Sequence, residues 1–261
     1  MKRSAMIGAI AGDVIGSIYE RYGIKTKDFP LFDWRCRFTD DTVLTVAVAD
    51  ALMTGGNYVA ALQSYYRRYP DAGYGGSFHT WGRSSTPQPY GSFGNGSAMR
   101  VSPVAYAFDD MQAVLAEAKR SAEVTHDHPE GIRGAQATAA AVFLARRQTV
   151  KSGIQSYLEQ EFHYDLSKTL DSVRPGHKFD VTCQGTVPIA VRAFLEAEDY
   201  EDAIRNAVSM GGDSDTLACI AGSIAGAYYG VPSFIESEVR DRLDDGLRRV
   251  VDLFEQRYGT R

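Results

Sequence analysis

Two short segments of the chain combine a threonine with two aspartates directly before a long apolar stretch. The first is Thr39-Asp40-Asp41, ahead of residues 42–53, and the second is Asp213-Ser214-Asp215-Thr216, ahead of residues 217–229. Both stretches have the composition of buried helices, so each acidic segment marks a helix start. Carboxylates and hydroxyls commonly cap a helix there, because they accept hydrogen bonds from its free N–H groups and meet the positive end of its dipole.

A metal site is the second interpretation of the same two segments. One carboxylate is enough for a cap, and four carboxylates that converge on a buried face would repel one another unless cations lay between them. Aspartate and threonine offer only hard oxygens, which suit Mg²⁺, Mn²⁺ or Ca²⁺ and disfavour zinc or copper. The sequence therefore predicts two divalent cations that share bridging carboxylates, and helix capping remains open as the alternative.

A glycine-rich segment is the second feature with chemical potential. It consists of Gly91, Ser92, Phe93, Gly94, Asn95 and Gly96, and a helix is expected to begin just after it, near Ala98. The backbone N–H groups of such a turn, together with a helix N-terminus, form an anion site. A plain turn with Ser97 as helix cap is the alternative. We expect Arg100, among apolar neighbours, to brace this loop through hydrogen bonds.

The elements that must position these residues are helices. Apolar residues recur with helical periodicity, and Gly, Pro and capping residues mark the ends. We expect helices at residues 4–22, 40–54, 57–69, 97–107, 110–123, 129–148, 153–161, 187–197, 199–210, 215–230 and 234–257. No convincing strand pattern, linker or change of composition interrupts them. The sequence predicts an all-α fold, a compact multi-helix bundle of one domain over residues 1–261 with the metal site at its centre.

Glycines recur every fourth residue in two of these helices, at Gly8, Gly12 and Gly16 and again at positions 222, 226 and 230. Each costs roughly 1 kcal/mol of helix stability relative to alanine, so a compensating close approach of two helices is expected. We interpret both stripes as packing at the centre of the fold, without a chemical role. The irregular stretches 71–96 and 165–185 are better candidates for function, because long loops in a compact domain usually carry it.

Composition excludes several classes of protein. Apolar residues make up 44% and charged residues 23% of the chain, which excludes disordered and fibrous proteins. The net charge of −5 argues against a protein that holds nucleic acid or an anionic membrane through its overall field. Three cysteines without a CxxC pair indicate neither a disulfide framework nor a thiolate zinc site. We therefore expect a cytoplasmic protein.

Two stretches imitate export or membrane segments. Residues 4–12 resemble the apolar part of a signal peptide, but Asp13 ends the run and helical periodicity continues through it. Residues 216–235 are uncharged and long enough to cross a bilayer. Their Gly, Ser and Tyr content and Pro232 instead predict a buried core helix.

Five motifs in this order resemble the ADP-ribosylglycohydrolase family. They are GAIAGDVIGSIYE at residues 8–20, FTDDT at 38–42, GSFGNGSAMR at 91–100, THDHPEG at 125–131 and GGDSDT at 211–216. The resemblance spans about residues 5–230. It implies a compact all-α fold around a binuclear Mg²⁺ or Mn²⁺ centre, with metal ligands Thr39, Asp40, Asp41, Asp213, Asp215 and Thr216.

The resemblance also implies roles around the metal centre. The reaction would break the bond at the anomeric carbon of ADP-ribose, with Asp213 able to take a proton from water and Glu20 near the bond that is cleaved. The glycine-rich segment would bind the pyrophosphate, Phe93 would stack on the adenine, and His126 would lie near the phosphates or adenosine. A surface acid at Glu20, a core side chain at Phe93 and a structural histidine at His126 are the alternatives.

Three other interpretations of function stay open. His126-Asp127 is an HD dyad, so an HD-type helical metal phosphohydrolase is conceivable. A non-catalytic ADP-ribose-binding or crystallin-like protein is the second, although the complete acid set argues against it. The third keeps the hydrolase and makes the substrate a small molecule, such as an acylated ADP-ribose. Expected partners are an ADP-ribosylated protein or a small ADP-ribose conjugate, with no membrane, and with nucleic acid only as an ADP-ribosylated acceptor.

Overall fold

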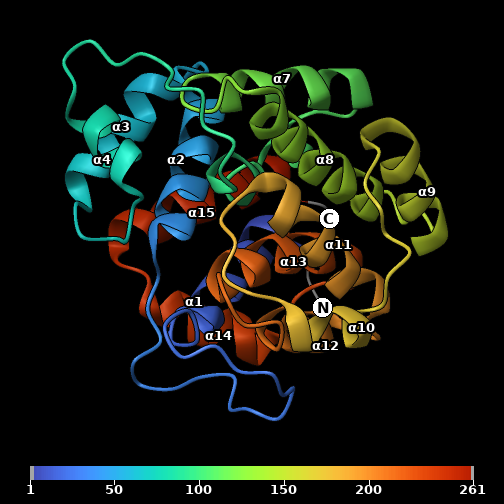
Figure 1. Ribbon diagram of the computed structural model, residues 1–261. Helices are drawn as coiled ribbons and strands as arrows, with labels where there is room; N and C mark the ends of the chain where they lie inside the picture. The colour runs from blue at the N-terminus through green and yellow to red at the C-terminus, as the bar shows by residue number, and fades with distance from the viewer. Residues whose placement is uncertain (1–2, 260–261) are drawn as a thin grey trace.

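The computed structural model describes residues 3–259, which form helices joined by loops (Figure 1). In chain order the helices are α1 (Ala5–Gly16), α2 (Asp40–Thr54), α3 (Tyr58–Arg68), α4 (Gly76–Arg83), α5 (Gly96–Met99), α6 (Val104–Ala107), α7 (Met111–Glu123), α8 (Pro129–Arg146), α9 (Lys151–Phe162), α10 (Leu170–Val173), the 3₁₀ turn η1 (Arg174–Gly176), α11 (Cys183–Glu196), α12 (Tyr200–Val208), α13 (Ser214–Tyr228), α14 (Ser233–Arg242) and α15 (Asp245–Tyr258). Within residues 3–259 no sheet forms, and an isolated bridge pairs Gly94 with Thr182. The predicted all-α fold is confirmed. Of the predicted domain 1–261, residues 1–2 and 260–261 lie outside the described part.

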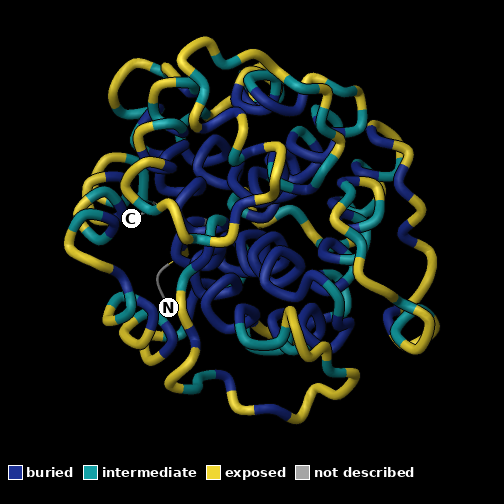
Figure 2. The backbone as a smooth tube through the Cα atoms, turned by 60° about the vertical axis from the view of Figure 1, so that its left-hand side comes forward, coloured by how far each residue is buried: buried dark blue, intermediate teal, exposed yellow. Residues whose placement is uncertain are grey.

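Helices α1 and α13 pack along their glycine stripes at the centre of the fold. A Cβ on Gly8 would lie 2.3 Å from the carbonyl oxygen of Gly222, and one on Gly12 would lie 2.0 Å from that of Ala218. Only glycine permits so close an approach, which compensates for its cost in helix stability. Figure 2 shows the buried backbone gathered in the middle of the molecule with exposed segments around it.

Helix α13 is buried along residues 214–227, as predicted for this apolar stretch, and it also packs against α8, α11 and α12. Helices α7 and α9 lie outside α8, and α15 packs against α2. Among the helices described, none combines the length and the apolar character that crossing a membrane requires.

Two predicted helices are each divided in two. The helix expected at 97–107 consists of the single turns α5 and α6, because Pro103 has no N–H to donate and disfavours helical backbone at the residue before it. The helix expected at 234–257 is divided into α14 and α15. Asp244 causes this second break, since its carboxylate accepts the N–H of Leu247 and caps a new helix.

Other predicted boundaries were also wrong. The first helix ends at Gly16 instead of residue 22. Directly after it, Ser17 Oγ accepts a hydrogen bond from the N–H of Arg37, which connects this helix end to the following loop. Helix α11 begins at Cys183 rather than 187, because Thr182 caps it and Pro188 is tolerated inside it. The predicted loops 71–96 and 165–185 contain the short helices α4 and α10.

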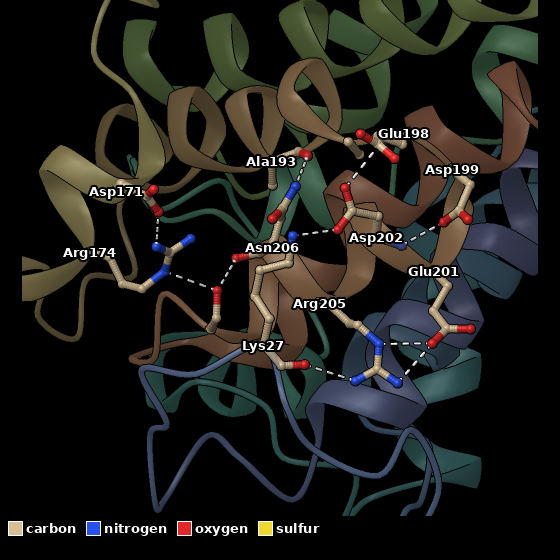
Figure 3. A network of polar contacts seen from close by, with 12 residues as sticks. Lys27, Asp171, Arg174, Ala193, Glu198, Asp199, Glu201, Asp202, Arg205 and Asn206 are labelled. Atoms are coloured by element: carbon tan, nitrogen blue, oxygen red, sulfur yellow. Dashed lines mark hydrogen bonds and ion pairs between the residues drawn. The ribbon is translucent and has the colours of Figure 1, made fainter.

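Helix α12 holds two of the loops in place (Figure 3). Lys27, in the loop after α1, forms an ion pair with Asp202, and Arg205 donates to the carbonyl oxygen of Lys27 at 2.9 Å. Arg174, in the loop before α11, donates to Ser209 Oγ at 3.1 Å. Both loops contribute to the candidate site, so α12 fixes part of its wall.

Candidate functional site

The two acidic segments meet where α2 and α13 begin, next to the C-terminal end of α1. Thr39 caps α2, and its Oγ1 accepts the N–H of Asp41 at 3.3 Å. Thr216 Oγ1 donates to Asp41 Oδ2 at 3.3 Å and so joins the two segments directly. Asp213 occupies the cap position of α13, but its side chain makes no capping hydrogen bond. Helix capping therefore accounts for Thr39 and leaves the role of Asp213 unexplained.

Two overlapping groups of carboxylates have the spacing of metal ligands. One oxygen from each of Asp13, Asp41 and Asp215 lies within 4.8 Å of the others, and the same holds for Glu20, Asp213 and Asp215. Asp215 belongs to both groups. A carboxylate shared in this way is what two neighbouring cations would need, so these acidic residues could hold metal ions.

Asp40 belongs to neither group and borders another part of the site. Its N–H donates to the carbonyl oxygen of Ala72 at 2.8 Å, and a Cβ on Gly73 would lie 3.3 Å from its Oδ1. The predicted ligand Asp40 thus lies against the segment that links α3 and α4, on the wall of the same cavity.

Asp13 is the residue that sequence reasoning missed. It is fully buried in α1, and its carboxylate accepts hydrogen bonds from the N–H and the hydroxyl of both Thr39 and Thr42. Three of these bonds end on Oδ2 and one ends on Oδ1, which can still accept another. Asp13 holds the start of α2, so we regard it as a positioning residue. Its signal in the sequence was a charged residue inside an otherwise apolar helix.

The carboxyl groups at the two helix starts are costly to ionise without a cation. Burial, followed by the charge of Asp13, raises the pKa of Asp40 to about 8 and raises the pKa of Asp41 as well. Burial and then the charge of Asp41 raise the pKa of Asp215. Asp41 Oδ1 is buried and has no hydrogen-bond partner among the described residues. An unsatisfied buried carboxylate oxygen fits a hard cation.

Glu20 lies in the turn after α1, on the cavity wall, where its side chain is exposed to solvent. Partial burial, and then the charge of Asp213, raises the pKa of its carboxyl group, while Arg21 and Arg37 act in the opposite direction. A carboxyl group with a raised pKa beside a cleft is suited to exchange protons with a substrate or with water.

A cavity of about 840 Å³ connects the acidic residues to the glycine-rich loop. The lining includes the predicted residues Glu20, Thr39, Asp40, Asp41, Ser92, Gly94, Asn95, Gly96, His126, Asp213, Asp215 and Thr216. The structure thus brings together segments more than 170 residues apart. Gly91 and Phe93 are in the loop but do not line the cavity.

The loop leaves several backbone donors free. Gly94 N–H donates to Ser92 Oγ and Asn95 N–H donates to the carbonyl oxygen of Val181. In the part of the chain that the structure describes, the amides of Phe93, Gly96 and Ser97 make no hydrogen bond. Because α5 is a single turn, these free amides support an anion site better than a helix dipole does.

Asn95 connects the loop to the acidic residues. Its side-chain amide donates to Asp213 Oδ2 at 2.6 Å and to Thr186 Oγ1 at 3.0 Å. The side chain of Asn95 is therefore engaged with Asp213 and fixes its Oδ2. The carboxyl group of Asp213 also interacts with the side chains of Asp215 and Thr216.

Phe93 and His126 differ in their exposure to solvent. Phe93 is 46% exposed, which rules out the alternative of a core side chain, and its ring centroid is 5.3 Å from that of His128. His126 is buried on the cavity wall, and its Nδ1 lies 2.7 Å from Thr125 Oγ1. Burial, followed by the charge of Arg100, lowers the pKa of His126, so the ring is neutral at physiological pH.

Comparison with known proteins identifies the family. Residues 2–261 match the family model described as ADP-ribosylglycohydrolase. The chain belongs to the ADP-ribosylglycohydrolase family. It is 27% identical to the ADP-ribosylhydrolase ARH3 of Danio rerio, over 97% of this chain and 90% of that protein. It is 25% identical to the ADP-ribosylarginine hydrolase Tri1 of Pseudomonas putida, over 90% of this chain and 73% of that protein.

A solved structure agrees with this assignment. The chain superimposes with a TM-score of 0.73 and 25% identity on a structure described as an ADP-ribosylglycohydrolase-related protein complex, covering 97% of this chain and 96% of the other. The family and the relatives named as hydrolases identify the protein as a hydrolase of glycosidic bonds. The family assignment replaces the HD-type phosphohydrolase alternative. In agreement, Asp127 belongs to neither carboxylate group, and its Oδ1 accepts the N–H of Gly91 at 2.6 Å.

Proposed function

We propose that this protein is a metal-dependent hydrolase that cleaves the glycosidic bond at the anomeric carbon of ADP-ribose and so removes ADP-ribose from an acceptor. The observation that carries the proposal is one cavity lined both by the carboxylates of Glu20, Asp41, Asp213 and Asp215 and by Gly96, whose backbone amide has no partner among the described residues. Its volume lies within the range of small-ligand pockets. The relatives named as ADP-ribosylhydrolases support the reaction class.

Two Mg²⁺ or Mn²⁺ ions are the proposed cofactors. Their ligands would come from the starts of α2 and α13: Thr39, Asp40, Asp41, Asp213, Asp215 and Thr216. Bound divalent cations supply the lowered pKa of water that hydrolysis at neutral pH requires. The unpartnered oxygen of Asp41 and the shared position of Asp215 support this set.

Two carboxyl groups of the chain are the proposed proton acceptors and charge stabilisers. Asp213 is the candidate general base, because Asn95 orients its carboxyl group on the cavity wall beside the other acidic residues. Glu20 lies within 4.8 Å of Asp213 and Asp215, at the side open to an acceptor. A pair of carboxyl groups around the reacting carbon suits the oxocarbenium-like transition state of glycoside hydrolysis.

The glycine-rich loop is the proposed pyrophosphate site. The free amides of Gly96 and Ser97 would donate to phosphate oxygens, and His126 lies beside them on the cavity wall. Phe93, on the outer side of the loop, has the exposed ring that stacking on adenine needs. Gly91 and Ser92 shape the loop through bonds to Asp127 and Gly94.

The acceptor is proposed to be an ADP-ribosylated protein side chain or a small ADP-ribose conjugate. Among the relatives, Tri1 is named for arginine acceptors, whereas the name of ARH3 specifies no acceptor. The segments on the open side of the cavity, around residues 71–76 and 179–181, would contact the leaving group. We further propose a cytoplasmic location, which suits three free, buried cysteines.

A panel of substrates tests the proposal. ADP-ribosylated arginine and serine peptides, an ADP-ribosylated nucleic-acid end and an O-acyl-ADP-ribose are incubated with Mn²⁺ or Mg²⁺, and the products are identified by mass. The wild-type protein should release free ADP-ribose from at least one substrate. Asp213→Asn and Asp41→Asn should abolish release, whereas Asp127→Asn, which can still accept the N–H of Gly91, should retain it. Release of phosphate or a nucleotide instead of ADP-ribose would overturn the proposal.

A further inference from the structure

A buried chain of hydrogen bonds lies behind the glycine-rich loop and ends at His126. Arg100 Nη2 donates to the carbonyl oxygen of Ser121 at 3.0 Å and to Thr125 Oγ1 at 2.8 Å. Thr125 Oγ1 in turn lies 2.7 Å from His126 Nδ1. Arg100 and Thr125 are fully buried, and His126 is 4% exposed. The chain is therefore shielded from water except where it reaches the cavity.

The direction of these bonds follows from what each group can donate. A guanidinium has only donors, so Thr125 Oγ1 must accept from Arg100 and retains one proton to donate. That proton has two possible acceptors, His126 Nδ1 at 2.7 Å and the carbonyl oxygen of Ala122 at 3.5 Å. The carbonyl of Ala122 already accepts the N–H groups of Thr125 at 3.1 Å and of His126 at 2.8 Å. The hydroxyl therefore donates to Nδ1.

This direction determines the form of the imidazole. Because Nδ1 accepts a hydrogen bond, the single proton of the neutral ring is on Nε2. Nε2 makes no hydrogen bond within residues 3–259. A Cβ on Gly96 would lie 3.3 Å from Nε2, and one on Gly94 would lie 3.7 Å away. The free Nε2–H thus faces the loop next to the free amide of Gly96.

We propose that Arg100 and Thr125 are positioning residues that hold His126 as a neutral Nε2–H donor to a phosphate oxygen of the bound ligand. The identity of that ligand, ADP-ribose, rests on the proposed function. The tautomer of His126 follows from the hydrogen bonds alone and is independent of that function. The buried charge of Arg100, whose Nε and Nη1 have no partner among the described residues, disfavours a second proton on the ring.

The tautomer is measured first, on the ligand-free wild-type protein. Two-dimensional ¹H–¹⁵N NMR that correlates ring protons with ring nitrogens distinguishes a protonated from an unprotonated nitrogen. His126 should show a protonated Nε2 and an unprotonated, hydrogen-bonded Nδ1 at pH 7. A protonated Nδ1, alone or together with Nε2, would overturn the inference without any variant.

The positioning role is then tested with a matched set of threonine variants. Thr125→Val keeps the shape of the side chain and removes the hydroxyl, so the hydrogen-bonded signature of Nδ1 should disappear and the affinity for ADP-ribose should fall roughly tenfold, as for one charge-assisted hydrogen bond. Thr125→Ser should keep both. Thr138→Val is the control, because Thr138 Oγ1 is equally buried and has no partner in the described residues.

The possible failures are distinguishable. Equal affinity of the wild-type protein and Thr125→Val for ADP-ribose, with both folded by circular dichroism, would overturn the positioning role and leave the proposed function intact. Absence of ADP-ribose binding to a wild-type protein with the expected tautomer would overturn the proposed function, and with it the identity of the ligand in this inference.

Discussion

The substitution Gly16→Ala tests how the packing of the central helices sets the geometry of the site. Gly16 is the last residue of α1, and a Cβ there would lie 2.5 Å from the Cα of Asp215 and 2.6 Å from the carbonyl oxygen of Ser214. Both atoms belong to the backbone, so no side chain can rotate away. Alanine at this position must push the start of α13 away from α1.

The size of the effect follows from these distances. Ordinary contact begins at 3.4 Å, so the start of α13 must move by 3.4 − 2.5 = 0.9 Å. Overpacking of this kind costs about 1–3 kcal/mol, partly offset by at most about 1 kcal/mol from the better helix propensity of alanine. Metal–ligand distances tolerate only about 0.2 Å, and Asp213 and Asp215 move with the helix. We expect a net loss of about 1–2 kcal/mol in stability and a loss of at least about tenfold in metal affinity.

Thermal unfolding with and without Mn²⁺, together with calorimetric metal binding, measures both effects. Gly8→Ala is the matched control, because its Cβ would lie 2.3 Å from the carbonyl oxygen of Gly222, two helical turns from the site. It should destabilise the fold and keep the metal response. Gly176→Ala, with nothing within 4 Å, should change neither. Gly16→Ala with a wild-type metal affinity would refute the reasoning.

Three further predictions concern pH, the loop and α1. The pKa of Asp40 is about 8 in the metal-free fold, whereas aspartates of the unfolded chain titrate near 4, so the folded chain binds protons more tightly. The stability of the metal-free protein should therefore fall as the pH rises from about 4 to about 8. Millimolar Mg²⁺ or Mn²⁺ should therefore raise the melting temperature more at pH 8 than at pH 5, and equal gains would contradict this. Phe93→Ala should weaken inhibition by free ADP-ribose by about 1–3 kcal/mol, and an unchanged inhibition constant would remove Phe93 from the adenine site. Asp13→Asn replaces a carboxylate that accepts four hydrogen bonds from Thr39 and Thr42 with an amide that has a single acceptor oxygen. Urea unfolding should therefore show a loss of about 2–4 kcal/mol; a smaller loss would mean that α2 is held in another way.

The features that were predictable from the sequence are those with local signals. The starts of α2, α7 and α12 coincide with capping residues that accept a hydrogen bond from an N–H two or three residues further on. The two acidic segments were recognisable as helix starts for the same reason, because a capping residue and the helix that it caps are adjacent in the sequence. Their convergence was a hypothesis from residue types, because four carboxylates ahead of buried helices would need cations between them, and the resemblance to a family supported it.

Asp13 shows why the long-range polar contacts of the site were not predicted. A charged residue inside an apolar helix is a local signal, but its partners Thr39 and Thr42 are 26 and 29 residues away, so the sequence did not show what Asp13 accepts from. The same is true of Asn95, whose contact with Asp213 spans 118 residues. Local patterns identify the residues at element ends, whereas long-range polar contacts depend on a packing arrangement that those patterns leave undetermined.

The glycine stripes link a local sequence pattern to the long-range geometry of the site. Their spacing indicated close packing of two helices and no chemistry, yet the last glycine of the α1 stripe lies against the backbone of Asp215. Hydrogen bonds reinforce that contact, because Ser214 Oγ donates to the carbonyl oxygen of Gly16 at 3.1 Å. Asp13, one turn earlier on the same helix, holds the start of α2. One helix therefore sets the distance between the two acidic segments, through its small residues on one side and its single carboxylate on the other.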